Sequence, residues 1–182
     1  MTASSDAEAT RPTYRVALSL GANLGDRLAA LQGATGLLTG SRRLANARVS
    51  AVYETEPVGG PEQPGYLNAV LVGVTSQTPQ QLLELAHEVE QEYRRTRETR
   101  WGPRTLDVDI LAFGDVVSAD PELTLPHPRA HERGFVLVPW AQVEPSAELV
   151  GHGAVAALAA EATAREGADA VRRTDLVLVV PS

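Results

Sequence analysis

The order of strand-like and helix-like segments predicts an α+β fold whose antiparallel sheet carries helices on one face and leaves the other face for an active site. Apolar residues alternate in some segments and recur every three or four positions in others. The resulting order is β-α-β-β-α-β, which is that of a ferredoxin-like sheet. The six segments are 14–20, 27–38, 44–54, 66–75, 78–94 and 106–113.

The clearest boundaries are those of the two core helices. The turn Gly21–Asp26 precedes the first helix, in which Leu28, Leu31 and Leu38 keep helical spacing. The second helix has a strong start, because Thr78 can cap it and Pro79 suits its first position.

Additional elements are expected after this core. They are a hairpin within 116–125, a helix after residue 133, a short helix at 154–161 and a strand at 176–180. Residues 1–13 are small and polar, which is typical of a disordered tail. We therefore expect a single domain over residues 14–182, because neither a repeat nor an interdomain linker is evident.

Composition narrows the possible chemistry. Cysteine and lysine are both absent, which excludes thiol nucleophiles, cysteine-bound metals, Walker-type phosphate loops and Schiff bases. The net charge of −7 argues against a general nucleic-acid surface. Neither a membrane-spanning run nor a secretory signal is seen, so we expect a cytoplasmic protein without membrane or nucleic-acid partners, and a monomer.

Two aspartates in the last of the six core segments are the most informative residues for function. If the segment Asp107-Val108-Asp109 is a strand, both carboxylates lie on one face, with Cα atoms roughly 6.6 Å apart. Such carboxylates suit Mg²⁺, which takes one or two of them and completes its shell with water and phosphate. The alternative is a salt bridge to Arg100 or Arg104.

Arginine is concentrated just before these aspartates, and this favours an anionic ligand. A helix end explains the first two arginines but not the last two, which lie beside Gly102 and Pro103. Trp101 lies in a polar setting typical of a stacking contact. The arginines are Arg94, Arg95, Arg97, Arg100 and Arg104.

Two more groups are candidates for ligand contacts. Tyr66 and Asn68 share a strand face after a Pro- and Gly-rich loop that starts near Thr55. Asn68 offers both a donor and an acceptor, as a heteroaromatic ring edge requires, although turn chemistry and packing are the alternative. His127 lies between two prolines and is either a phosphate donor or a turn residue.

Six ordered blocks of sequence recur at characteristic separations. The strongest block is residues 100–111, RWGPRTLDVDIL. The others are LGANLGD at 20–26, YETEPVG at 53–59, QPGYLN at 63–68, LPHP at 125–128 and RGFVL at 133–137. Together they resemble the hydroxymethyl-dihydropterin pyrophosphokinase family of folate biosynthesis, from about residue 14 to residue 149.

The resemblance implies transfer of the terminal diphosphate of ATP to 6-hydroxymethyl-7,8-dihydropterin, with release of AMP. It implies that Asp107 and Asp109 hold two Mg²⁺ ions, and that Arg95 and Arg97 close over the triphosphate as catalytic residues. The implied ATP-binding residues are Glu90, Arg100, Arg104, Ile110, Thr124, His127 and Arg133. The implied pterin-binding residues are Thr55, Pro57, Val58, Tyr66, Asn68, Trp101 and Phe135.

Two departures and two rival functions stay open. Glu122 stands where some members of the family carry an arginine, and the segment after Gly151 has no recognised counterpart. The rivals are a phosphoryl or nucleotidyl transferase with another acceptor and a non-catalytic ligand-binding module. A general base for the attacking hydroxyl is not identified.

Overall fold

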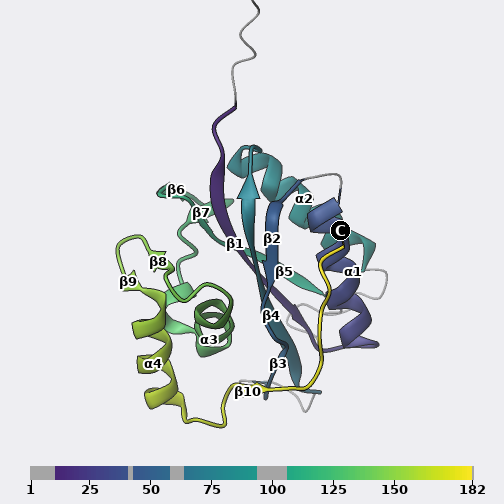
Figure 1. Ribbon diagram of the computed structural model, residues 1–182, viewed down its shortest axis with the longest axis vertical. Helices are drawn as coiled ribbons and strands as arrows, with labels where there is room; N and C mark the ends of the chain where they lie inside the picture. Colours follow the sequence, from purple (N-terminus) through teal and green to yellow (C-terminus); the bar gives the residue numbers. More distant parts are fainter. Residues whose placement is uncertain (1–10, 41–42, 58–63, 94–105, 182) are drawn as a thin grey trace, which may run out of the picture.

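The computed structural model describes residues 11–40, 43–57, 64–93 and 106–181, and shows a mixed α/β fold around an antiparallel sheet (Figure 1). The strands of this sheet lie in the order β10-β3-β4-β1-β5, and β2 also pairs with β4. Its strands are β1 (Tyr14–Ala22), β2 (Ala45–Val49), β3 (Tyr53–Thr55), β4 (Tyr66–Thr75), β5 (Asp107–Phe113) and β10 (Arg172–Arg173). The helices are α1 (Arg27–Thr39), α2 (Pro79–Glu92), the 3₁₀ turn η2 (Ala130–Glu132), α3 (Gly134–Val143) and α4 (Val155–Glu166).

The start of α2 confirms the predicted cap. The Thr78 hydroxyl accepts a hydrogen bond from the Gln81 backbone N–H, and the Gln81 side chain accepts one from the Thr78 N–H. This reciprocal pairing satisfies two donors that a helix start leaves free. The helix ends at Glu92, two residues before the predicted end, with Tyr93 as its C-cap.

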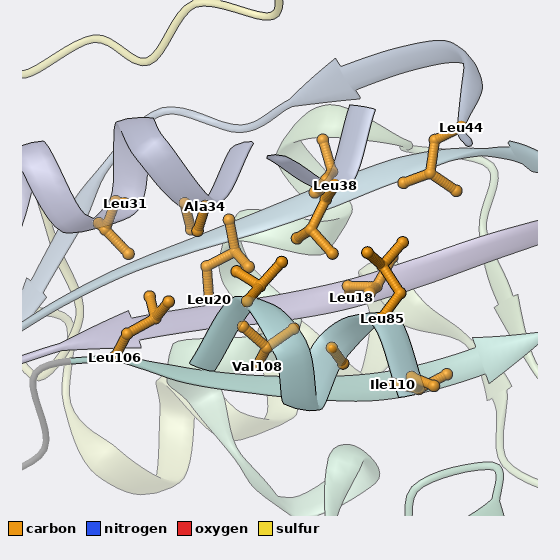
Figure 2. Close-up of a cluster of buried hydrophobic side chains, with 14 of the residues drawn as sticks. Leu18, Leu20, Leu31, Ala34, Leu38, Leu44, Leu85, Leu106, Val108 and Ile110 are labelled. Carbon is orange, nitrogen blue, oxygen red and sulfur yellow. The ribbon is translucent and has the colours of Figure 1, made fainter. Parts of the chain in front are cut away.

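A leucine-rich core lies between one face of the sheet and helices α1 and α2 (Figure 2). In Figure 2, Leu18 and Leu20 of β1 meet Val108 and Ile110 of β5 beneath the helices. Burial of these side chains supplies the main driving force for placing β5 beside β1. The same alternation sends Asp107 and Asp109 to the opposite face.

The expectation that the opposite face is free of helices is wrong for part of that face. Helices α3 and α4 pack there on a second core, which includes Ala17, Val72 and Leu111 of the sheet together with Trp140 of α3 (Figure 1). A bulge between β1 and β5 at Ala17 adds an extra residue on β5 at this place. The predicted metal ligands of β5 lie further along these strands, opposite Ser19 and Gly21 of β1.

The predicted strand 44–54 is instead two strands, β2 and β3. Between them, the Ser50 hydroxyl accepts a hydrogen bond from the Val70 N–H, and the Ala51 N–H donates to the Gln142 side chain of α3. These side-chain partners replace the regular ladder and interrupt the strand.

The C-terminal part also differs from the expectation. Helix α4 runs to Glu166, five residues further than predicted, because Ala162 continues its buried stripe. Residues 176–180 are not a strand, since the Val179 N–H and C=O both pair with the side-chain amide of Gln32 in α1. The chain thus crosses the sheet edge from α4 to α1 (Figure 1).

The remaining strands form two small hairpins. The predicted hairpin is confirmed as β6 (Ser118–Asp120) with β7 (Leu123–Leu125), and β8 (Glu148–Leu149) pairs with β9 (Gly153–Ala154). Among the described residues, the helices are too short or too polar to cross a membrane. Residues 1–10 of the predicted tail lie outside the described residues.

Candidate active site

Strand pairing brings the predicted metal and pterin residues onto neighbouring positions of one sheet face. Gly21 of β1 pairs with Asn68 of β4 on one side and with Asp107 of β5 on the other. One step along β1, Ser19 pairs with Asp109. With strands about 4.8 Å apart, the Cα atoms of Asn68 and Asp107 are separated by about 10 Å across the glycine.

The donor chemistry of Asp107 and Asp109 fits a hard divalent cation. Both side chains are half-buried and share a face, since Val108 and Ile110 point into the leucine core. Among the described residues, groups of three or more His, Cys, Asp or Glu arranged to hold a metal are absent. Two carboxylates on one face suit Mg²⁺, whose remaining ligands are water and phosphate.

Glu90 lies behind this pair rather than on the same face. Its carboxylate is buried, and its Oε1 accepts a hydrogen bond of 2.9 Å from the Val108 backbone N–H. Strand β5 lies at the end of the sheet, so this bond satisfies a donor that lacks a strand partner. Glu90 thus holds the backbone between the two aspartates.

His127 lies beside β5 and close to the aspartates. Its backbone N–H donates to the Leu111 carbonyl, and its Nδ1 accepts from the Arg129 N–H at 3.2 Å. That acceptor role leaves Nε2 as the protonated nitrogen of the neutral ring. Burial lowers the pKa of His127, and Arg133 adds to this, while Asp107 acts in the opposite sense.

This lowered pKa predicts a pH-dependent stability. The unfolded chain protonates His127 near pH 6.5, whereas the folded protein resists protonation until a lower pH. The free energy of unfolding should therefore fall as the pH drops below about 6.5, and this component should be absent in His127→Gln. Urea unfolding of both proteins between pH 7.5 and 5 measures the difference, and a constant difference would contradict the prediction.

Arg133 adds positive charge beside the aspartates and contacts Phe135, one of the predicted pterin residues. Burial and then Arg129 lower the pKa of Arg133, while Asp109 and Asp107 raise it, so all four groups lie within electrostatic range. An arginine stays a cation at neutral pH even so. Its Cζ lies 5.5 Å from the centre of the Phe135 ring, which fits a cation–π contact.

The predicted pterin residues of β3 and β4 lie together. The Asn68 Nδ2 donates to the Thr55 hydroxyl at 2.9 Å, and Tyr66 pairs with Thr55 in the strand register. Asn68 is only 3% exposed, so its amide is largely shielded from solvent. Pro57 follows β3 and is half-buried.

Two predicted ATP residues have side chains elsewhere. Ile110 points into the leucine core, on the face opposite the aspartates (Figure 2). Thr124 lies in the β6–β7 hairpin, where its hydroxyl donates to the Asp120 carbonyl. The predicted site residues that lie outside the described residues are Val58, Arg95, Arg97, Arg100, Trp101 and Arg104.

The sequence did not reveal Ser19, Gly21 or Arg129 as site residues. Ser19 and Gly21 form the floor between the two predicted pockets. An added Cβ on Gly21 would lie 3.4 Å from the Asn68 Oδ1, so a larger side chain there would crowd the amide. Ser19 and Gly21 are two residues apart, as Asp107 and Asp109 are. This matching spacing would have indicated the site residues of β1 if the pairing of β1 with β5 had been known.

Comparison with known proteins identifies one enzyme family that this chain resembles. Residues 17–145 match the family model of 7,8-dihydro-6-hydroxymethylpterin-pyrophosphokinase (HPPK). A relative from Bacillus subtilis is 45% identical over 126 residues, covering 69% of this chain and 75% of the relative. A relative from Mycobacterium leprae is 45% identical over 180 residues, covering 90% of this chain and 91% of the relative.

Solved structures agree at the level of the fold. A Plasmodium falciparum HPPK-DHPS triple mutant matches with a TM-score of 0.66 at 15% identity over 87% of this chain. This chain spans 46% of that longer protein. The family model covers most of β1 and all of β2 to β5 and α3, which include Gly21, Asn68, Asp107 and Asp109. The chain therefore belongs to the 7,8-dihydro-6-hydroxymethylpterin-pyrophosphokinase family.

Proposed function

We propose that this protein transfers diphosphate from ATP to 6-hydroxymethyl-7,8-dihydropterin, giving AMP and the pterin diphosphate in folate biosynthesis. The relatives from B. subtilis and M. leprae are both named 2-amino-4-hydroxy-6-hydroxymethyldihydropteridine pyrophosphokinase. The observation that carries the proposal is the row Asn68–Gly21–Asp107, which sets a ring-recognising amide beside a metal-binding carboxylate.

The two ends of this row have different tasks. At one end, Asn68 and Thr55 read the edge of the pterin, and Phe135 offers a ring for stacking. At the other end, Arg133 and neutral His127 supply donors for phosphate oxygens. The reaction then depends on holding the hydroxymethyl oxygen in line with the β-phosphorus.

The aspartates complete the phosphate end. Asp107 and Asp109 would hold two Mg²⁺ ions, which neutralise phosphate charge when bound. Glu90 keeps the two carboxylates in place through the Val108 backbone, while Ile110 can offer a nucleotide only its backbone groups. We also propose that the scaffold is ferredoxin-like, which the strand order β3-β4-β1-β5 supports, and that the protein acts as a cytoplasmic monomer.

The decisive experiment is a product analysis. The purified protein is incubated with ATP, Mg²⁺ and 6-hydroxymethyl-7,8-dihydropterin, and the nucleotides are identified by mass spectrometry. We expect AMP and a pterin that has gained two phosphoryl groups. Formation of ADP would instead indicate phosphoryl transfer, and pterin binding without any turnover would indicate a binding module.

Asn68→Leu should weaken pterin binding selectively. Leucine has a similar volume but leaves the polar ring edge without its partner in a buried site, which should cost about 1–3 kcal/mol, or roughly 5- to 150-fold in affinity. Titration with a pterin in the presence of a non-hydrolysable ATP analogue measures this change. The affinity for the ATP analogue alone should stay within about twofold, since the phosphate end is untouched. Unchanged pterin affinity would show that Asn68 serves only to bind Thr55.

A further inference from the structure

Arg27 joins the two chain segments that lead into and out of the Pro- and Gly-rich loop. Its Nη1 donates to the Glu54 carboxylate at 3.0 Å and to the Gly65 carbonyl at 2.5 Å. Glu54 lies in β3 just before Thr55, and Gly65 comes just before Tyr66. One guanidinium nitrogen thus ties together the ends of β3 and β4 that carry predicted pterin residues.

The C-terminal segment extends this contact. Arg172 of β10 lies 3.4 Å from the second oxygen of the Glu54 carboxylate and 3.5 Å from Glu56. Strand β10 also pairs with β3, where Arg172 is the register partner of Glu54. We refer to Arg27, Glu54 and Arg172 as the neck bridge.

Arg27 is the first residue of α1, where the helix dipole disfavours a cation and where the N-cap carboxylate of Asp26 already binds the Ala29 backbone N–H. The hydrogen bonds of Arg27 are made instead to Glu54 and Gly65. Its side chain is 28% exposed and that of Glu54 is 31% exposed, so the pair is partly shielded from solvent. An exposed ion pair would contribute little, whereas this one also holds a backbone carbonyl.

Gly65 shows how closely the two strands approach at this point. A Cβ added there would lie 3.1 Å from the Thr55 carbonyl oxygen and 3.5 Å from the Glu54 carboxylate. A shift of a few tenths of an ångström in Glu54 would therefore move Thr55 as well. The Thr55 hydroxyl in turn accepts a hydrogen bond from the Asn68 Nδ2 and so orients the Asn68 amide.

We propose that the neck bridge is a positioning device for the acceptor pocket, with Arg27 as its central residue. It ties Glu54 to Gly65 where the ladder between β3 and β4 ends at Thr55 and Tyr66, and thereby holds Thr55 and Asn68 ready for the ring edge. Among the described residues, its hydrogen bonds and ion pairs join α1, β3, β10 and Gly65, whereas the described part of the phosphate end lies on β5 and on the η2–α3 segment. The inference rests on the proposed function for the identity of the ring.

The test compares Arg27→Ala with wild type in the diphosphate-transfer assay. We expect the KM for the pterin alcohol to rise about tenfold, while kcat and the KM for ATP stay within about twofold. Arg27→Lys, which keeps the charge but offers no planar fork, should lie between the two. Arg172→Ala, which loses the longer and more exposed contact, should raise the pterin KM about twofold.

Arg48→Ala is the matched control. Arg48 makes the same kind of contacts elsewhere, since its Nη1 donates to the Val143 carbonyl at 3.0 Å and its Nη2 lies 4.0 Å from Glu144. Loss of this arginine should lower thermal stability without moving the pterin KM. If Arg48→Ala raises the pterin KM as much as Arg27→Ala does, the effect is one of general stability and the inference is wrong.

Direct binding separates this inference from the proposed function. If wild type forms no AMP, the proposed function fails, but pterin binding to Arg27→Ala is still measurable by titration of pterin fluorescence. A roughly tenfold weaker pterin affinity in Arg27→Ala supports the positioning role in either case, and an unchanged affinity overturns it. Gly65→Ala keeps all three charged residues but forces the strands apart, and it should weaken pterin binding in the same direction.

Discussion

Asp107→Ala and Asp109→Ala should each abolish almost all turnover while the fold stays intact. Removing a carboxylate that holds Mg²⁺ removes several kcal/mol of stabilisation for the charge of the transferring phosphoryl groups. A loss of about 4 kcal/mol corresponds to roughly a thousandfold in kcat. The leucine core is untouched, because both side chains lie on the opposite face from Val108 and Ile110.

Asp115→Ala provides the matched control for charge removal. Asp115 is exposed in the turn just after β5, at the far end of the strand from Asp107. Its loss should leave kcat within about twofold of wild type. In a thermal unfolding experiment, Mg²⁺ with a non-hydrolysable ATP analogue should stabilise wild type and Asp115→Ala but not Asp107→Ala. Near-normal turnover in either site variant would refute the two-metal assignment.

The sequence predicted best those features that depend on neighbouring residues. The alternation around Val108 placed both aspartates on one face, and Thr78 with Gln81 marked the start of α2. Strand β4 has the predicted bounds because apolar residues on both of its faces are flanked by Gly65 and by the turn before Thr78. These signals are local, so they do not depend on which elements later meet.

The features that the sequence could not predict depend on distant contacts. Helix α3 is almost wholly apolar, so its sequence indicated burial without indicating which sheet face it would cover. Residues 176–180 read as a strand, but the side chain of Gln32 takes the place of a strand partner. Ser19 and Gly21 carry little chemistry alone and become part of the site only through pairing with β4 and β5.

The same reasoning explains why the neck bridge was not evident. Arg27 and Glu54 are 27 residues apart, and Arg172 is a further 118 residues along the chain from Glu54. Each alone is an ordinary charged residue on a helix or strand. The three residues meet only when β3 and β10 pair in the sheet and α1 packs on it, which places the Glu54 carboxylate between the guanidinium groups of Arg27 and Arg172.

Arg95→Ala and Arg97→Ala should reduce kcat by about 100- to 1000-fold, which is the range for removing one donor to transition-state charge. Both residues lie outside the described part of the chain. Their expected role follows from the family resemblance, which implies that they close over the triphosphate.

The two arginines should differ from the aspartates in how they affect ATP binding. In the proposed site, Asp107, Asp109 and Arg133 would hold the ground-state triphosphate, so loss of Arg95 or Arg97 should change the Kd of a non-hydrolysable ATP analogue by less than about threefold. An interaction made only in the transition state lowers kcat and leaves binding unchanged. Lysine at either position should restore part of kcat, because it returns the charge without the bidentate geometry.

Arg15→Ala controls for the loss of one positive charge. Its guanidinium lies 3.5 Å from Glu144 and is 74% exposed, at the end of β1 far from Gly21. It should leave both kcat and the Kd unchanged within about twofold. If the Kd of the ATP analogue rises in Arg95→Ala or Arg97→Ala as much as kcat falls, that arginine binds the ground-state nucleotide. Its role would then be the same as that expected of Arg133, and charge stabilisation during transfer would rest on the metal ions and the remaining arginines.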